Sequence, residues 1–221
     1  MPDVNVSPTP VAGSALADQA ISRDLLERVA AGTLDGALRI WAPVPAVALS
    51  RLDELRPGAD AARAAAARAG VEAVLRVSGG HAVVVGTGSF CVGIAEAGPT
   101  FEGTQDRYER LTAALIQAFA ALGIDSEQGE LDGEWCPGAW SIRSGGVKLA
   151  GLAQRAIKGA AWAEAVVDLA PDERSRALLA EIYAALELPL DPATLGSVSE
   201  LAGRRVAFDE LAQPLLAQLA P

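Results

Sequence analysis

The amino-acid sequence predicts an α+β fold in which a mixed β-sheet is flanked by helices. Apolar residues recur at helical spacing near the start, in the middle and in a tail that begins at about residue 171. Between these segments lie short apolar runs bounded by glycine and proline, which predict strands. No internal repeat or linker interrupts the pattern, so residues 14–221 are expected to form a single domain after a Pro-rich, disordered lead-in at 1–13.

The elements of the first half can be taken in chain order. Ser14 is expected to cap a helix that reaches Ala31, with an apolar face of Leu16, Ala20, Leu25 and Val29. Residues 37–49 favour β structure, but Pro43 and Pro45 indicate an edge strand or a broken one. An Ala/Arg helix is expected between Gly58 and Gly70. Strands are expected at about 72–76, 82–86 and 90–95.

The second half opens with a long helix predicted from about Gln105 to Leu122. Its apolar face consists of Tyr108, Leu111, Leu115 and Phe119, and Gly123 ends it. Residues 139–143, 147–153 and 160–168 read as a β-meander. The tail is expected to be helical at 172–186, in a short helix opened by Asp191-Pro192-Ala193-Thr194, and at 207–219.

Composition limits the function classes. The chain has 221 residues and is 51% apolar, which is ample for a core. Its net charge of −10 argues against nucleic acid or an anionic membrane as a partner. The sequence lacks an 18-residue apolar run and a secretory signal, and its two cysteines are too few for a disulfide framework. Cys91, Cys136 and the single histidine do not form a metal-ligand set, so we expect a cytoplasmic protein with reduced thiols and no metal.

The most informative stretch is 134–155, which places Cys136 before a Pro-Gly turn and Lys148 after a Ser-Gly-Gly turn at 144–146. A nearby cation favours the thiolate, so this pair suits nucleophilic acyl chemistry. If the hairpin centres on Gly145, Lys148 faces Ile142, and an extended strand would leave Cys136 ~20 Å away. The Pro-Gly turn must therefore fold the thiol back for the two to cooperate. Cys91, on an apolar strand, is expected to lie in the core.

A second motif lies at 74–94, where Arg76, Ser78, Gly79, Gly80 and His81 precede a strand that begins at Ala82-Val83. Paired glycines let a backbone approach a ligand closely, although most such pairs are only turns. These five residues are expected to bind substrate. Arg76 has the alternative of pairing with a carboxylate, and His81 either acts as a base for Cys136 or lines the pocket.

Together the two motifs resemble those of the lipoate–protein ligase and octanoyltransferase superfamily, across about half of the chain. The Gly-Gly-Val-Lys-Leu-Ala-Gly segment is similar to its lysine motif, and Arg-Val-Ser-Gly-Gly is similar to its binding loop. Cys-Pro-Gly makes the chain most similar to the cysteine-dependent octanoyl (lipoyl) amidotransferase branch. The resemblance implies a biotin/lipoyl protein ligase-type fold. The chain departs from the ATP-using ligases at Leu75, Val85-Gly86 and Ser89, which argues against adenylation.

The resemblance implies that Cys136 takes an octanoyl or lipoyl group as a thioester and passes it to a lysine of a lipoyl domain. Lys148 would polarise the carbonyl, Gly151 and Ala153 would leave space for the acyl chain, and no cofactor would be required. The implied partners are lipoyl-domain proteins (the glycine-cleavage H protein or the E2 component of 2-oxoacid dehydrogenases) or acyl-carrier protein. They are typically acidic, so a basic patch is expected, formed by Arg143, Lys148, Arg155 and Lys158.

Two alternatives remain open at this point. An ATP-dependent lipoate or biotin ligase would not need the thiol. A non-catalytic protein that binds lipoyl domains or fatty acyl groups would show saturable binding without a covalent adduct.

Overall fold

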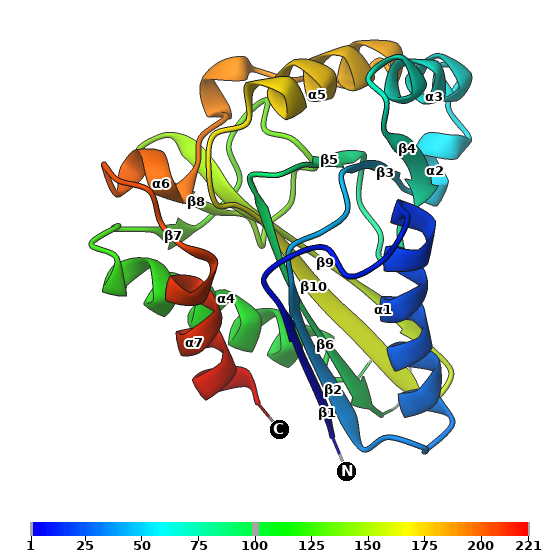
Figure 1. The fold of residues 1–221 in the computed structure, drawn as a ribbon, viewed down its shortest axis with the longest axis vertical. Coiled ribbons are helices and arrows are strands. Elements are labelled where there is room, and N and C mark those ends of the chain that lie inside the picture. Colours follow the sequence, from blue (N-terminus) through cyan, green and yellow to red (C-terminus); the bar gives the residue numbers. More distant parts are fainter. Residues whose placement is uncertain (1, 99–101, 221) are drawn as a thin grey trace.

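The computed structural model describes residues 2–98 and 102–220 (Figure 1). The strands are β1 (Asp3–Ser7), β2 (Gly36–Trp41), β3 (Ala46–Leu49), β4 (Glu72–Leu75), β5 (Val83–Val85), β6 (Ser89–Ala97), β7 (Glu127–Gln128), β8 (Ile142–Ser144), β9 (Val147–Ile157) and β10 (Ala160–Asp168). The helices are α1 (Ala15–Ala30), α2 (Arg51–Glu54), α3 (Ala59–Arg68), α4 (Thr104–Ala121), α5 (Glu173–Ala185), the 3₁₀ helix η1 (Pro192–Thr194), α6 (Val198–Leu201) and α7 (Phe208–Leu219). This arrangement confirms the predicted α+β class.

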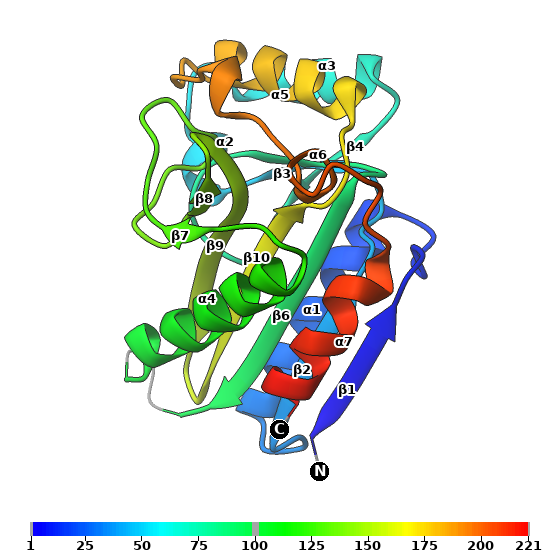
Figure 2. The same ribbon diagram turned by 90° about the vertical axis from the view of Figure 1, so that its left-hand side faces the viewer.

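The larger sheet has the strand order β1-β2-β6-β10-β9-β8-β7. β1 runs parallel to β2, and every other neighbouring pair in this sheet is antiparallel, so the sheet is mixed as expected. Figure 2 shows α4 and α7 on one face and α1 on the other. Because both faces are covered, β2 is buried at every position and β6 along most of its length.

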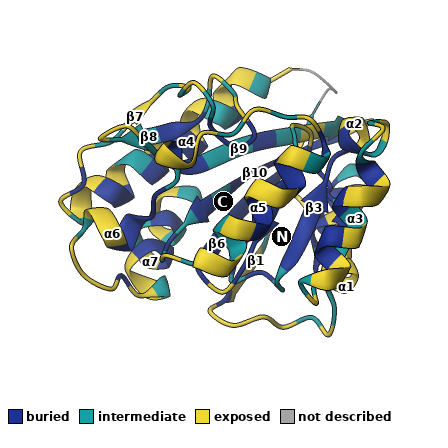
Figure 3. Ribbon diagram, turned by 90° about the horizontal axis from the view of Figure 1, so that it is seen from above, coloured by how far each residue is buried: buried dark blue, intermediate teal, exposed yellow. Residues whose placement is uncertain are grey.

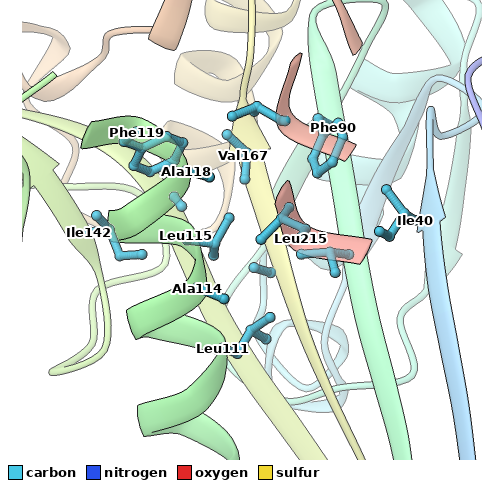
Figure 4. Close-up of a cluster of buried hydrophobic side chains, with 14 of the residues drawn as sticks. Ile40, Phe90, Leu111, Ala114, Leu115, Ala118, Phe119, Ile142, Val167 and Leu215 are labelled. Carbon is cyan, nitrogen blue, oxygen red and sulfur yellow. The ribbon is translucent and has the colours of Figure 1, made fainter. Parts of the chain in front are cut away.

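The larger sheet carries a core on each face. Between it and helices α4 and α7, the side chains interdigitate as Figure 4 shows for Phe90, Leu111, Leu115, Phe119 and Leu215. On the opposite face, α1 packs Leu25, Leu26 and Val29 against the two tryptophans of β2 and β10. Burying each such side chain stabilises the fold by about 1.5–3 kcal/mol.

A smaller sheet of three strands, in the order β4-β3-β5, lies across one end of the larger sheet (Figure 1). Its outer face is covered by α3 and α5, whose own outer faces are exposed (Figure 3). The core beneath these helices includes Trp135 and Cys136, which come from the loop between β7 and β8. The loop that carries the cysteine thus joins the small-sheet core, although the strands around it belong to the larger sheet.

The N-terminal prediction was partly wrong. Residues 3–7, placed in a disordered lead-in, form β1 and pair with β2. Prolines at 2, 8 and 10 dominate the composition, but the segment between them alternates polar residues with Val4 and Val6 and can continue the sheet. The edge that a lone β2 would expose is thereby paired.

Helix α1 confirms Ser14 as its cap, since the Ser14 hydroxyl accepts the Ala17 N–H at 3.1 Å. Its predicted apolar face was partly wrong, because Leu16 is 67% exposed. The helix turns Asp18 and Ser22 inward instead, where both bind the buried guanidinium of Arg39. An internal ion pair, invisible in the apolar periodicity, sets the orientation of the helix.

The other predicted elements are confirmed in kind, with bounds shifted by a few residues. The stretch 37–49 is broken as expected, and its halves join different sheets, with Pro43 and Pro45 in the connection. The short elements α2, α6 and β7 were not predicted, because two to four residues are too few to establish a period. None of the helices within the described ranges is long and apolar enough to cross a membrane.

Candidate active site

Cys136 lies in the loop between β7 and β8, at the junction of the two sheets. Its residue exposure is only 9%, and its φ of 41° falls in the left-handed region that non-glycine residues rarely adopt. The Sγ atom accepts the His81 main-chain N–H at 3.2 Å, and Nη1 of Arg76 lies 3.7 Å away. The cysteine and the glycine-rich loop, separated by more than fifty residues in sequence, therefore meet at the thiol.

Tyr183 of α5 holds the backbone of Cys136. Its hydroxyl accepts the Cys136 N–H and donates to the Ala82 carbonyl at 3.0 Å. Burial raises the pKa of Tyr183, which keeps the phenol neutral and able to donate. The tyrosine thus connects the cysteine loop to the start of the strand that follows the glycine-rich loop.

Lys148 contacts the cysteine loop through its backbone. Its Nζ lies 2.9 Å from Oε1 of Glu134, 2.6 Å from the Trp135 oxygen and 3.0 Å from the Cys136 oxygen. An ammonium has three protons, and these three acceptors take all of them. Burial lowers the pKa of Lys148, while the Glu134 carboxylate opposes this by favouring the ammonium form.

Glu134 organises the rest of this turn. Its carboxylate also accepts the N–H of Leu131 at 3.1 Å, the N–H of Gly138 at 3.3 Å and the Ser141 hydroxyl. Glu134 is 1% exposed, so its charge depends on these donors and on Lys148. The carboxylate and the ammonium together close the loop on which the thiol is presented.

The predicted hairpin register was wrong in detail, whereas the folding back of the turn is observed. Lys148 pairs with Arg143 rather than Ile142, because Ser144 pairs with Val147 and the turn therefore consists of Gly145 and Gly146. The ladder shifts by one residue only beyond this pair, between Arg143 and Ile142. The Pro-Gly turn brings Cys136 within hydrogen-bonding distance of Lys148. The atom reached is the carbonyl oxygen of Cys136.

Arg76 is held by Ser78. Its Nε and Nη2 donate to the Ser78 hydroxyl at 3.1 and 2.9 Å, and Nη1 donates to the His81 oxygen at 2.8 Å. Ser78 in turn donates to Glu164 of β10, whose second oxygen accepts the Trp162 indole N–H at 2.7 Å. A buried chain of hydrogen bonds therefore runs from the larger sheet to the cation beside the thiol.

The two glycines of the loop differ in what surrounds them. A Cβ at Gly80 would lie 2.6 Å from the Cys136 sulfur, and the φ of Gly80 is 94°. At Gly79 the nearest atom would be the Gln154 oxygen, at 3.9 Å. Gly80 is therefore the position that lets the loop approach the thiol.

The remaining predicted binding residues lie at the edge of this arrangement. A Cβ at Gly151 would meet the Trp135 ring at 2.8 Å, so that ring already occupies the space beside Gly151. Ala153 is buried on β9 opposite Glu164. The His81 ring contacts Asp53, with Nδ1 3.2 Å from Oδ1, while the contact of His81 with the thiol is made by its main-chain N–H.

A cavity of about 280 Å³ lies beside the glycine-rich loop, which forms part of its lining. Its charged lining residues are Arg23, Glu27, Arg51, Arg76 and Arg155. The side chains of Arg23 and Arg155 make no hydrogen bond or ion pair with the part of the chain that the structure describes. Arg76 and Gly80 line the cavity and also lie against the sulfur, so the cavity borders two of the residues that surround the thiol.

The predicted basic patch was wrong in its membership. Lys148 is fully buried, and Arg143 pairs with Glu127 at 2.9 Å. Arg155 lines the cavity, whereas Lys158 does not. Arginines of α1 and α2 stand at the cavity in place of the expected residues.

Several residues of the site escaped the sequence reasoning. Glu134 stands two residues before the cysteine within the motif itself, and its proximity to Cys136 and Lys148 was a usable signal. Tyr183, Glu164 and Asp53 are distant in sequence, and only the fold brings them in. Cys91 is buried between α1 and the larger sheet, as expected. Within residues 2–98 and 102–220, no group of three or more histidine, cysteine or acidic side chains could hold a metal ion.

Comparison with known proteins agrees with this geometry. An octanoyl-[GcvH]:protein N-octanoyltransferase from Geobacillus kaustophilus is 30% identical over 205 residues, which cover 87% of this chain and 72% of that protein. One from Oceanobacillus iheyensis is 27% identical over 208 residues, covering 90% of this chain and 75% of that protein. A crystal structure of lipoate-protein ligase A bound with ATP shares the fold, with a TM-score of 0.72 at 20% identity over 99% of this chain and 83% of that one. The model of the lipoyl protein ligase A/B catalytic domain matches residues 14–220, so the chain belongs to that family, as the two motifs predicted.

Proposed function

We propose that this protein transfers an octanoyl group from an octanoylated lipoyl-type domain to a lysine of a second protein, through a thioester on Cys136. The observation that carries the proposal is the surroundings of the sulfur. A backbone N–H and a guanidinium converge on Sγ, and both can donate to a sulfur that carries negative charge. The relatives named above bear names that combine octanoyl-[GcvH] with a protein substrate.

The transfer divides into two steps. The thiolate attacks the amide carbonyl of the octanoyl-lysine on the donor, a C–S bond forms, the C–N bond breaks, and the proton lost by the thiol ends on the departing amine. The lysine amine of the acceptor then attacks the thioester, the C–S bond breaks, and the amine's surplus proton passes to solvent. A covalent intermediate thus divides one difficult transfer into two easier displacements, each with its own nucleophile. No cofactor takes part.

Lys148 has a different part in this proposal from the one first expected. Its three protons are already used by Glu134 and by two carbonyl oxygens of the cysteine loop. The lysine therefore positions Cys136, and the acyl carbonyl is polarised by other donors. This assignment fits its complete burial.

The arginine-lined cavity is the proposed approach of the carrier domains. In a chain of net charge −10, three arginines and one glutamate at its exposed rim form a local basic region. Acidic residues of a lipoyl domain such as GcvH, the glycine-cleavage H protein, would be attracted to it. The cytoplasm, where thiols stay reduced, is the compartment that suits a thiol-dependent transferase.

The test is the intact mass of the protein after mixing with octanoylated GcvH. We expect an adduct of one octanoyl group that hydroxylamine removes, present in the native protein and absent in C136A. The C91A variant is the matched control, because burial raises the pKa of the Cys91 thiol well above its ordinary value and keeps it unreactive. C91A should therefore form the adduct normally. Folded protein that forms no adduct with octanoylated GcvH, E2 domain or acyl-carrier protein would overturn the proposal.

A further inference from the structure

Arg76 borders both the cavity and the Cys136 thiol. Arg76 lines the cavity, is 8% exposed, and places Nη1 3.7 Å from Sγ. The side chain is therefore placed to meet an acyl group that enters the cavity. Lys148, the other cation near the cysteine, has its protons engaged by the loop.

Ser78 keeps Arg76 from pairing directly with the nearby carboxylate. A buried arginine beside a glutamate ordinarily forms a two-pronged ion pair with it. Here the Ser78 hydroxyl accepts hydrogen bonds from Nε and Nη2 of Arg76 and donates one to the Glu164 carboxylate. Among the ion pairs of the described residues, Arg76 and Glu164 do not appear as partners. Nη1 consequently stays directed at the His81 oxygen and the sulfur.

A second buried network in the same molecule shows the ordinary arrangement. Arg39 pairs directly with the Asp18 carboxylate and also donates to the Ser22 hydroxyl at 2.8 Å. The Trp41 indole N–H completes it by donating to Asp18 at 3.2 Å. Each network joins an arginine, a serine and a tryptophan to one carboxylate, which is Glu164 beside the thiol and Asp18 in the second network. They differ in the place of the serine. Ser78 stands between Arg76 and Glu164, whereas Arg39 and Asp18 contact each other directly.

We propose that Arg76 is a catalytic residue for acyl transfer and that Ser78 is its positioning residue. The inference rests on the proposed function and deepens it. The Arg76 guanidinium and the His81 N–H first stabilise the Cys136 thiolate. When sulfur attacks the carbonyl carbon, the C–O π pair moves onto oxygen, and the same two donors turn to that oxyanion. The pair returns as the C–N bond breaks and the amine leaves.

The experiment measures the rate at which iodoacetamide alkylates Cys136 as a function of pH, with the site confirmed by peptide mass. Only the thiolate reacts, so the profile reports how strongly the protein favours it. In R76Q we expect the rate at pH 7 to fall about tenfold or more and the midpoint to move to higher pH. R76K keeps the positive charge but loses the planar set of guanidinium donors, so its profile should lie between those of the native protein and R76Q. A change in access alone would scale the rate without moving the midpoint.

The S78A variant tests positioning without altering any charge. Removing the hydroxyl frees Arg76 to pair with Glu164, so the midpoint should again move to higher pH. S22A is the matched control, because Ser22 is also a buried acceptor of an arginine N–H, in the network away from the thiol. It should leave the profile unchanged even if it lowers stability. Native-like profiles in both folded S78A and folded R76K or R76Q would overturn the inference.

Failure of the inference about Arg76 and Ser78 can be told apart from failure of the proposed function. If native protein takes no octanoyl group but its alkylation profile depends on Arg76 and Ser78, the assignment of the thiolate stands and the substrate is wrong. If the octanoyl adduct forms and the profile is insensitive to both residues, the transferase stands and Arg76 is not its catalytic cation.

Discussion

The side-chain nitrogen of Lys148 lies 3.0 Å from the carbonyl oxygen of Cys136, so the lysine acts on the cysteine through the main chain. The contact fixes the turn in which Cys136 holds a φ of 41°. A left-handed backbone at a residue with a Cβ persists where its surroundings impose it. Lys148 and Tyr183, which bind the oxygen and the N–H of the same residue, are those surroundings.

Replacing Lys148 by methionine should destabilise the protein strongly, because the Glu134 carboxylate would remain buried without its cation. The expected loss in free energy of unfolding is about 3–5 kcal/mol. The E134Q/K148M double variant removes both charges and should be less destabilised than the sum of the single variants. Urea unfolding of the four proteins measures this. Strict additivity of the two losses would contradict the pairing.

Gly80 and Gly79 provide a matched pair of alanine substitutions. G80A introduces a Cβ 2.6 Å from the Cys136 sulfur at a φ of 94°, so we expect Cys136 alkylation and octanoyl transfer to fall by at least tenfold. G79A has 3.9 Å to its nearest neighbour and should retain most activity. Equal activity in the two variants, measured by adduct formation, would show that the loop does not approach the thiol this closely.

The Y183F variant removes a hydroxyl that bridges the Cys136 N–H and the Ala82 carbonyl. Both groups would be left buried without a partner, so the free energy of unfolding should fall by about 2 kcal/mol. Cys136 alkylation should also change, since the main chain of Cys136 loses its contact with Tyr183 and keeps only the one with Lys148. The measurement pairs urea unfolding with the alkylation rate. A variant as stable as the native protein would rule out the bridge.

Asp168 predicts a pH dependence of stability. Burial raises its pKa to about 7, although Arg176 and Lys148 favour its charged form. A carboxyl whose pKa is higher in the folded state stabilises the protein when protonated. That contribution is complete below about pH 4 and is lost as pH rises towards 7. D168N should therefore reduce the decline in free energy of unfolding between pH 5 and 7.5, by at most about 3 kcal/mol. An identical decline in both proteins would contradict this.

The fold was largely predictable because its long elements carry strong local signals. The Ser14 cap, the Gly70 and Gly123 stops and the meander behind residue 139 each follow from a few neighbouring residues. The orientation of α1 was not predictable, since Asp18 faces inward only because Arg39 lies there. β1 was missed because prolines hid a five-residue strand.

For the site, the sequence placed Cys136, Arg76 and Gly80 in two motifs, and the fold brings them into contact. The division of labour between the two cations did not follow from the motifs. It depends on which atom Lys148 reaches and on Ser78 standing between Arg76 and Glu164, both of which are tertiary relationships. Motif spacing identifies residue types that meet at a site, whereas hydrogen-bond saturation decides what each can still do there.

Strand β1 also has a bearing on how the protein behaves at high concentration. Without it, the larger sheet would end at β2, whose six residues are all buried and mostly apolar. An unpaired apolar edge strand of this kind can pair with the edge of another molecule. With it, the border is a strand whose side chains alternate Asp3, Asn5 and Ser7 with two valines. Trimming the first thirteen residues as expendable would therefore favour aggregation while leaving every residue around the thiol in place.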